Sequence, residues 1–445
     1  MARADSITTT VLLIAYHYAP LHSTGVQRVA KFEQYLPEFG YLTRVLTTSA
    51  FGGGTQDETV SRAWEPLGAY RWLFNGQARK NPGAAARVRT ESTTTARLAR
   101  VGGRLLVPDM QVTWIPAAVV KTLQELRSGS ASLIYSSYPP ASAHLVALIA
   151  KQMSGVPWVA DFRDSWTADP LDPDLFGRPR RLALERRLES AVVRSADAII
   201  ASTSVAAQYL RESHPDHAER IHVITNGFDP SDLPEVAVAA PANDTSRPLH
   251  LVHTGSFSGS HPWRSPHGLL DALKLLCTDD PTWAQRIKVT LVGRLSTEEE
   301  QATADLQRSG LLQTIEEADH STALKFQCSG DVLLLVDHPR PWPASNLPNK
   351  LFEYLGLRRP VLALCTPGMV ADTVSELKAG LCAAPDDPAA IGDAIRQLHA
   401  AFVSGSLQQY ACSEPLHRFH RRTLTQQLAR LFDDVLGRDT RVPRL

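Results

Sequence analysis

The sequence predicts an α/β protein built from two doubly wound domains. Short apolar, β-rich runs alternate with segments of helical period, and this alternation occurs in two series separated by an aperiodic stretch. Apolar strands that alternate with helices are typical of parallel sheets covered on both faces. The chain has 445 residues, and at roughly 150 residues per domain this length suits two or three domains.

The first series extends to about residue 230. Its expected strands are Val11–Tyr16, Leu42–Thr47, Leu133–Ser137, Trp158–Phe162, Ala198–Thr203 and Ile221–Thr225. Helices are expected between them, at Val26–Leu36, Ala143–Met153 and Arg180–Ser195. We therefore assign residues 1–230 to an N-terminal Rossmann-like domain.

The second series follows an aperiodic stretch rich in Pro, Ala, Asn, Asp and Ser, which predicts a linker at 231–248. Its expected strands are Leu249–Thr254, Lys288–Val292, Asp331–Val336 and Pro360–Leu364, with a helix at Ala389–Ala401. These elements predict a C-terminal domain at 249–413. The remaining segment, 414–445, contains the amphipathic helix RTLTQQLARLFDDVL, which we expect to pack back toward the N-terminal domain.

Composition and missing motifs exclude several classes of protein. The 46 basic residues balance 46 acidic ones, which disfavours a general nucleic-acid binder. Five cysteines without a C-x-x-C spacing, a polar start and no long apolar run predict a cytoplasmic chain without a signal peptide or membrane span. No G-x-G-x-x-G, G-x-x-x-x-G-K-[ST], G-x-S-x-G or H-E-x-x-H motif is present, so dehydrogenases, P-loop NTPases and zinc hydrolases lack support.

One segment, Gly76–Arg104, carries seven basic residues against the single acid Glu91. If this segment is helical, Arg97, Arg100 and Arg104 share a face. The stretch from Arg79 to Arg104 then suits a contact with anionic lipid at the inner face of the membrane, or with a phosphorylated acceptor. The alternative is a surface loop, because the glycine pair at 102–103 opposes a helix.

Two candidate sites follow expected strands of the first series, where ligands of open α/β sheets bind. In HYAPLHSTGVQRVAKF, Gly25 precedes a helix and would let the backbone approach a phosphate, unless this is an ordinary turn. In VADFRDSW, the charges of Asp161, Arg163 and Asp164 cluster beside Trp166. They suit either a polar substrate or a structural Arg–Asp pair.

The third candidate site is SNLPNKLFEYLGLRRPVLAL, at residues 345–364. Pro348 suits the first turn of a helix, where the N–H groups of Asn349, Lys350 and Leu351 would be free. The Lys350 side chain adds positive charge, and Glu353 follows one turn later. This layout would hold a diphosphate at the helix start and a sugar diol at the carboxylate. The alternative is an amphipathic helix with solvated charges.

Several segments resemble one protein family when they are taken in order. They are HYAPLHSTGVQRVAKFEQYLPEFGY, PDMQVTWIPAA, IYSSYPPASAHL, PWVADFRDSW, ITNGFD, LHLVHTGSFSG and NLPNKLFEYLGLRRPVLAL. They resemble the retaining glycosyltransferases of family four, in a branch common in polysaccharide and natural-product gene clusters. The resemblance covers nearly the whole chain. It implies the GT-B fold, in which two Rossmann-like domains face each other across a cleft.

The resemblance implies an enzyme that moves a sugar from a nucleotide-diphospho-sugar to an acceptor with retention of configuration. The N-terminal domain would be the acceptor side, and the acceptor would be a lipid-linked glycan or a soluble metabolite. The donor is a co-substrate, and the resemblance implies neither a cofactor nor a divalent metal. By position, the donor-binding residues would be Gly25, Ser256, Arg264, Asn349, Lys350, Leu351 and Glu353.

The sequence departs from the family pattern at two positions. The family has two glutamates eight positions apart; the later one matches Glu353, but Ser345 stands at the earlier one. Arg163 stands where many members have a histidine near the reacting sugar. In the mechanism that the resemblance implies, Asp161 or Asp164 would orient the acceptor and Arg163 would steady developing negative charge.

Two other functions stay open on this evidence. One is a sugar–nucleotide enzyme without transfer, such as a 2-epimerase, which needs acid–base groups facing the sugar ring. The other is a catalytically inactive nucleotide-sugar-binding partner subunit, for which Ser345 is the argument.

Overall fold

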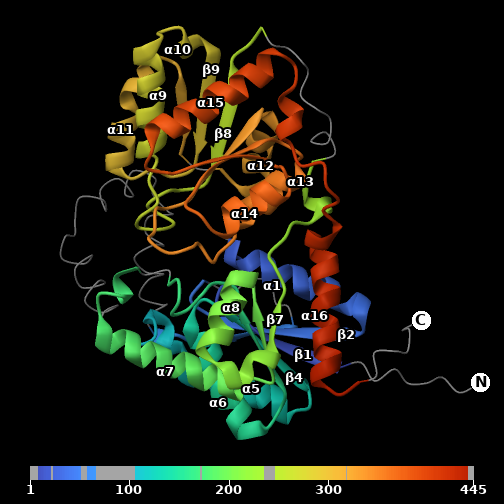
Figure 1. Ribbon diagram of the computed structural model, residues 1–445. Helices are drawn as coiled ribbons and strands as arrows, with labels where there is room; N and C mark the ends of the chain where they lie inside the picture. Colours follow the sequence, from blue (N-terminus) through green and yellow to red (C-terminus); the bar gives the residue numbers. More distant parts are fainter. Residues whose placement is uncertain are drawn as a thin grey trace, which may run out of the picture. The chain divides into compact units, whose positions relative to one another are not determined.

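The computed structural model describes residues 9–21, 24–51, 58–66, 106–170, 173–234, 246–316 and 318–438, so the segment from Arg79 to Arg104 lies outside the described residues. The chain forms two compact units, which are drawn in Figure 1. The first comprises Met1–Thr225 and Arg421–Leu445, and the second comprises Asn226–His420. Each contains a parallel sheet with helices on both faces, so the predicted fold class is confirmed.

The sheet of the first unit has the strand order β3-β2-β1-β4-β5-β6-β7, and all of its pairs are parallel. Its strands are β1 (Thr9–Ile14), β2 (Tyr41–Thr48), β3 (Val60–Ala63), β4 (Leu133–Tyr138), β5 (Trp158–Phe162), β6 (Ala198–Ala201) and β7 (Ile221–Val223). Strand β1 pairs with β2 on one side and with β4 on the other, and the chain order reverses there. This reversal is the topological switch point of the sheet.

The two faces of this sheet are covered by different helices. The helices of the first unit are α1 (Thr24–Tyr35), α5 (Ile115–Arg127), α6 (Ala141–Ser154), α7 (Pro179–Ser195), α8 (Ser204–Ser213) and α16 (Arg421–Val435). Because strand residues alternate between faces, Val11 and Leu13 pack in the core with α1 and α16. Their neighbours Leu12 and Ile14 pack in the core with α5, α6, α7 and α8.

Helix α16 therefore closes the first unit although it lies near the end of the chain. Leu424 and Leu428 belong to the core under α1. The hydroxyl of Tyr41, on β2, donates a hydrogen bond to Asp433 (2.7 Å), and its ring packs edge-on against Phe432. The apolar stripe that marks this helix in the sequence is the face that these contacts bury.

The second unit repeats the same strand order, β10-β9-β8-β11-β12-β13, again with parallel pairs. Its strands are β8 (Leu249–Thr254), β9 (Ile287–Val292), β10 (Leu312–Ile315), β11 (Val332–Val336), β12 (Val361–Leu364) and β13 (Gly380–Ala383). Its helices are α9 (His267–Asp279), α10 (Trp283–Arg286), α11 (Thr297–Arg308), α12 (His320–Ser329), α13 (Asn349–Gly356), α14 (Met369–Glu376) and α15 (Pro388–Val403). The switch point of this sheet lies between β8 and β11.

Short 3₁₀ helices connect several of these elements, at Leu36–Phe39, Met110–Trp114, Pro173–Leu175, Pro215–Arg220, Pro230–Asp232, Leu407–Tyr410 and His417–Phe419. In the part of the chain that the structure describes, none of the helices combines the length and apolar content needed for a bilayer span.

Candidate nucleotide-sugar site

The switch point of the second unit brings two loops together. The loop after β8 begins at Gly255 and the loop after β11 begins at Asp337. The second loop leads into α13, which begins at Asn349 after Pro348. Ligands of open α/β sheets bind outside the carboxyl ends of the strands at such a point.

Gly255 lets the Lys350 side chain lie directly over the first loop. Gly255 has a φ of +107°, which side chains rarely adopt, and a Cβ there would collide with Nζ and Cε of Lys350, the latter at 2.7 Å. The neighbouring strand end is equally close, because a Cβ on Gly293 would lie 2.5 Å from the Gly255 carbonyl carbon. The Gly255 N–H donates to the Val292 carbonyl (2.5 Å). Glycines therefore permit a close approach of two strand ends and one ammonium group.

The Lys350 ammonium lies in this turn without a compensating carboxylate contact. Among the described residues, none forms an ion pair or hydrogen bond with it. Burial, together with the nearby positive charge of Arg264, lowers the pKa of Lys350 to about 8, and Glu353 opposes this shift. The site thus holds a cation whose charge the surrounding protein does not neutralise.

Asp337, at the start of the second loop, holds cations of both loops. Its carboxylate accepts from Arg340 (2.7 Å) and lies 3.0 Å from His338 Nδ1 and 3.5 Å from Arg264 Nη2. Burial alone would raise the pKa of Asp337, but these three partners outweigh it and hold the pKa well below its usual value. The His338 ring stacks on His261 with centroids 3.6 Å apart. Asp337 is therefore an ionised anchor that fixes both arginines.

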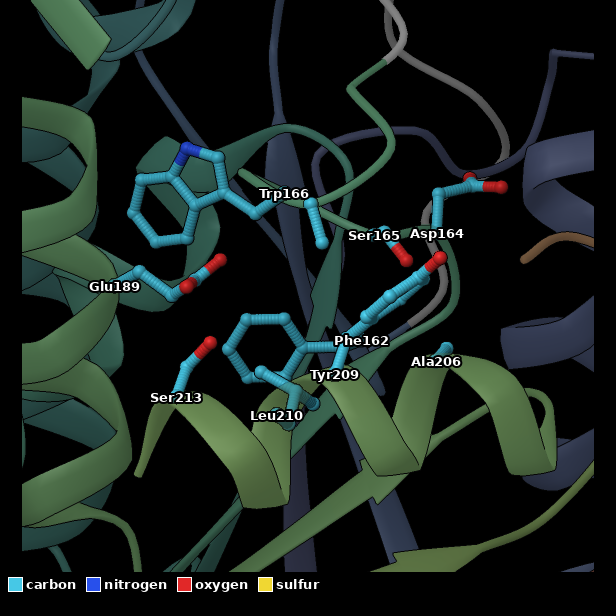
Figure 2. Close-up of a pocket in the computed structure, with 10 residues that line it drawn as sticks. Phe162, Asp164, Ser165, Trp166, Glu189, Ala206, Tyr209, Leu210 and Ser213 are labelled. Atoms are coloured by element: carbon cyan, nitrogen blue, oxygen red, sulfur yellow. The ribbon is translucent and has the colours of Figure 1, made fainter. Parts of the chain in front are cut away.

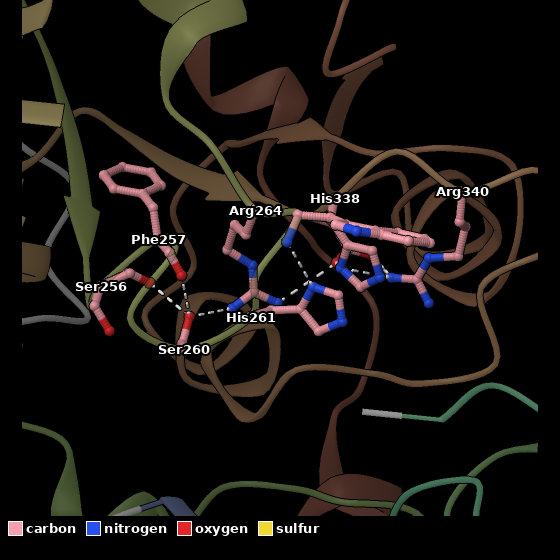
Figure 3. A network of polar contacts seen from close by, with 9 residues as sticks. Ser256, Phe257, Ser260, His261, Arg264, His338 and Arg340 are labelled. Atoms are coloured by element: carbon pink, nitrogen blue, oxygen red, sulfur yellow. Dashed lines mark hydrogen bonds and ion pairs between the residues drawn. The ribbon is translucent and has the colours of Figure 1, made fainter. Parts of the chain in front are cut away.

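Arg264 is also held from its own loop. Its Nη1 donates to the Ser260 hydroxyl (2.8 Å), which itself lies 2.7 Å from the Ser256 carbonyl oxygen (Figure 3). Burial lowers the pKa of Arg264, and Asp337 opposes this effect. Arg264 Nε is buried and has no hydrogen-bond acceptor among the described residues. Ser256 thus supports a cation through its backbone carbonyl.

Glu353 lies one turn into α13 and is held by α12. Gln327 donates to Glu353 Oε2 (3.2 Å) and to the Thr254 hydroxyl (3.0 Å), which ties the carboxylate to the end of β8. The other oxygen, Oε1, lies 4.0 Å from His320 Nε2. Because the Glu353 side chain is 13% exposed, it keeps access to a ligand.

The expectation of three free N–H groups at the start of α13 was wrong for Leu351. Its N–H donates to the Pro348 carbonyl (3.0 Å), because the chain closes a tight turn as it enters the helix. The Leu351 side chain is fully buried in the core of the second unit. Its role is packing, whereas the Lys350 side chain beside it faces the Gly255 turn.

The residues predicted for catalysis lie in the first unit, and the structure separates Asp161 from the other two. Asp161 is fully buried on β5 and forms a two-point ion pair with Arg28 of α1, at 2.7 and 3.0 Å. It also accepts from the Tyr135 hydroxyl. Arg28 in turn donates to the carbonyls of Ile224 and Thr225. This geometry is that of a structural Arg–Asp pair, with Arg28 rather than Arg163 as the partner.

Arg163 and Asp164 lie at the end of β5, beside the start of α1. Arg163 Nη1 donates to the Gly25 carbonyl (2.6 Å), and Arg163 Nε lies 3.5 Å from Asp164. A Cβ on Gly25 would lie 3.3 Å from both terminal nitrogens of Arg163. Burial raises the pKa of Asp164, and Arg163 opposes this shift. Gly25 thus accommodates an arginine of its own unit.

Helix α7 fixes the rest of the loop that follows β5. Glu185 accepts from the indole N–H of Trp166 (2.6 Å), and Glu189 accepts from the N–H and hydroxyl of Thr167 (3.1 and 2.9 Å). Figure 2 shows a small pocket here, with Trp166 and Glu189 at one end and Asp164 at the other. Its space corresponds to roughly one water molecule. The loop is therefore tightly packed.

Comparison with known proteins finds a family similar to part of the chain. Residues 24–227 match the family described as "Glycosyl transferase 4-like domain". The match agrees with the resemblance seen in the sequence. No curated protein sequence matches the chain.

Solved structures resemble the chain over nearly its whole length. Sucrose-phosphate synthase from Thermosynechococcus elongatus is 15% identical (TM-score 0.65; 96% of this chain and 99% of that chain). The Anabaena protein HepE in complex with UDP-glucose is 18% identical (0.59; 96% and 99%). Trehalose 6-phosphate synthase from Burkholderia multivorans is 14% identical (0.61; 98% and 100%). At these identities the likeness establishes the fold, which is GT-B.

Sequence reasoning missed four residues of these two sites. In the first unit it missed Arg28, whose partner Asp161 is 133 positions away. In the second unit it missed Gly255, Asp337 and Arg340. The sequence does carry a signal for Asp337 and Arg340. They follow directly after an apolar strand, which is where open α/β sheets bind their ligands.

Proposed function

We propose that the protein is a glycosyltransferase that transfers a sugar from a nucleotide-diphospho-sugar to an acceptor hydroxyl. The observation that carries this proposal is the Lys350 ammonium over the Gly255 turn, at a switch point where Arg264 and Arg340 also gather. The match to the glycosyl transferase 4-like family and the fold shared with sugar-nucleotide complexes support it.

The donor diphosphate would bind to the second unit. Three cations, Lys350, Arg264 and Arg340, face two carboxylates, Asp337 and Glu353, so the site carries a positive excess for an anionic ligand. A diphosphate placed at the Gly255 turn would supply the anion that Lys350 lacks. Glu353 would accept hydrogen bonds from the ribose diol through Oε1.

In the reaction that we propose, the donor sugar keeps its anomeric configuration. The bond between the anomeric carbon and the diphosphate oxygen breaks, and the acceptor oxygen bonds to the same face of that carbon. The leaving phosphate takes the acceptor proton. Lys350 and Arg264 would stabilise the charge that develops on the leaving group, so no divalent metal is required in this scheme. Arg163 and Asp164 would act on the acceptor side.

Asp161 has a positioning role in this proposal. Both of its oxygens are used inside the core by Arg28 and Tyr135, so it holds α1 against β5. The same strand presents Arg163 and Asp164 directly afterwards. The buried ion pair would therefore fix the position of the loop after β5, which carries the two acceptor-side residues.

The test is a panel of UDP-, GDP- and TDP-sugars. A donor should raise the melting temperature, because a ligand that binds only the folded state stabilises it. The same donor should then release its nucleoside diphosphate only when an acceptor is added. NMR of the product would give the anomeric configuration.

The panel also separates the two alternatives. Conversion of a nucleotide-sugar into its epimer without an acceptor would identify a 2-epimerase-like enzyme. Binding without turnover, and without slow hydrolysis of the donor, would identify an inactive partner subunit. In the latter case the buried serine at position 345 would be the first residue to examine.

A further inference from the structure

Helix α7 presents an outward face rich in arginine. Four arginines of this helix are exposed, namely Arg180, Arg186, Arg187 and Arg194. We call them, together with the exposed Leu184 between them, the α7 arginine face. Figure 1 shows α7 along the outside of the first unit.

The acidic residues of α7 do not reach this face. The helix has two, Glu185 and Glu189, and both are buried where they hold Trp166 and Thr167. Among the described side chains, no carboxylate pairs with any of the four exposed arginines. The basic residues that do pair, Arg178 with Asp174 and Arg181 with Glu185, lie at the start of the helix.

The spacing aligns charge with apolar surface. Arg180, Leu184, Arg187 and Arg194 follow one another at intervals of four, three and seven residues, so they lie along one line of the helix. Leu184 is 43% exposed. Like charges on one face repel each other, and an anionic partner would relieve this repulsion. Because the whole chain has no net charge, this concentration is local.

We propose that the α7 arginine face docks on the surface of an anionic lipid bilayer. Arginines bind lipid phosphates in two-point contacts, while Leu184 would enter the boundary between headgroups and acyl chains. A nucleic acid would also pair with the arginines, but it offers nothing comparable for the exposed leucine. The proposal is independent of the proposed transferase reaction, because it uses no residue of the donor site.

The experiment is sedimentation of the full-length protein with vesicles. We expect the protein to bind vesicles of phosphatidylcholine that contain roughly 30% of the anionic lipid phosphatidylglycerol. It should not bind vesicles of pure phosphatidylcholine. High salt should remove it, since surface charges are screened. Each basic residue near an anionic surface strengthens binding about fivefold. The variant Arg180→Gln/Arg187→Gln/Arg194→Gln should therefore bind about a hundredfold more weakly, and Leu184→Gln a few-fold more weakly.

The matched control is Lys121→Gln/Arg127→Gln/Arg430→Gln, which removes the same charge from exposed positions of α5 and α16. It should bind like the wild type. Equal loss in both triple variants, or unchanged binding of the α7 variant, overturns the proposal; unchanged binding would also point to the segment from Arg79 to Arg104. Binding of single-stranded RNA that the α7 variant loses, without vesicle binding by the wild type, overturns it as well. If circular dichroism shows that the triple variant is unfolded, Arg187→Gln alone should still lose about fivefold.

Donor binding provides the readout that keeps the two proposals apart. The α7 variant should keep the melting-temperature shift with the donor nucleotide-sugar, because the changed side chains are on the outer surface of the first unit. Loss of vesicle binding with retained donor binding supports the docking face whatever the transfer reaction proves to be.

Discussion

Replacing Lys350 with methionine should weaken donor binding and at the same time stabilise the fold. Methionine keeps most of the length of the side chain over the Gly255 turn and removes its charge. Binding loses a charged hydrogen-bond donor to phosphate, worth about 1.5–3 kcal/mol, so affinity should fall roughly ten- to a hundred-fold or more. The free energy of unfolding should increase, because burial and the nearby Arg264 make the charged ammonium unfavourable in the folded wild type.

The size of the stability effect follows from the lysine pKa. Burial and Arg264 lower it from 10.5 to about 8 in the folded protein, which corresponds to about 3 kcal/mol against the charged form. Solvent access at the rim of the site makes this an upper bound. At pH 7 Lys350→Met should therefore be more stable than the wild type by up to about 3 kcal/mol.

The pH dependence has a definite sign. The folded-state pKa lies below the unfolded value, so between pH 8 and 10.5 the unfolded chain binds more protons at Lys350. Stability of the wild type should rise with pH through that window, and the contribution should be absent in Lys350→Met. Donor affinity should fall about tenfold between pH 7 and 9 in the wild type as the ammonium loses its proton, and stay level in the variant.

Denaturant unfolding at several pH values and calorimetric titration of the donor measure both effects. Lys325→Met serves as the control, because Lys325 is exposed on α12; it should change neither quantity. A Lys350→Met protein that is less stable at pH 7 and binds the donor normally would refute the assignment of Lys350 to the phosphate site.

Four further predictions concern the other residues of the two sites. Glu353→Ala should weaken donor affinity roughly ten- to several-hundredfold in a folded protein, as titration would show, since hydrogen bonds to a carboxylate are worth about 1.5–3 kcal/mol each. Asp161→Asn should cost about 3–5 kcal/mol in denaturant unfolding because it leaves Arg28 buried without its ionised partner, and the double variant with Arg28→Met should recover part of that loss. Arg163→Ala should lower turnover far more than donor affinity, because its proposed effect is in the transition state; near-normal turnover in a stable variant would remove it from catalysis. Activity should persist in excess EDTA; complete loss that magnesium or manganese restores would contradict the metal-free scheme.

The central strands of both sheets could be predicted from the sequence, and so could the edge strand β7, whereas the other three edge strands could not. Buried parallel strands such as β1 and β11 are continuous apolar runs, TTVLLI and VLLLV, which have no other common explanation between helices. The missed strands are β3, β10 and β13, with the sequences VSRA, LQTI and GLCA. Each ends its sheet. Edge strands are short and half exposed, so their sequences lack the apolar signal.

Only those parts of the candidate site that lie close together in the sequence could be predicted. Helix α13 with Lys350 and Glu353 could be placed because proline, asparagine and charge mark its start within a few residues. The partner of Lys350 is Gly255, which lies 95 positions earlier and meets it only because β8 and β11 are neighbours in the sheet. The pairing of Asp161 with Arg28 depends in the same way on α1 lying against β5. Arg163, two positions after Asp161 in sequence, does not pair with it and donates to the Gly25 carbonyl in the first turn of α1 instead.

The repeated fold explains why we assign the diphosphate to the second unit. Both sheets share the same order over six strands and the same kind of switch point, and the first sheet adds β7 at its edge. In the first unit the cation near the start of α1 is Arg163, and its charge is already engaged by the Gly25 carbonyl and by Asp164. In the second unit the cation at the loop after β8 is Lys350, and no described residue forms an ion pair or hydrogen bond with its ammonium. A phosphate would have to displace existing contacts in the first unit but would complete the coordination of a charged group in the second. Because an unpaired, largely buried charge is costly and an anion removes that cost, the second switch point is the more favourable phosphate site.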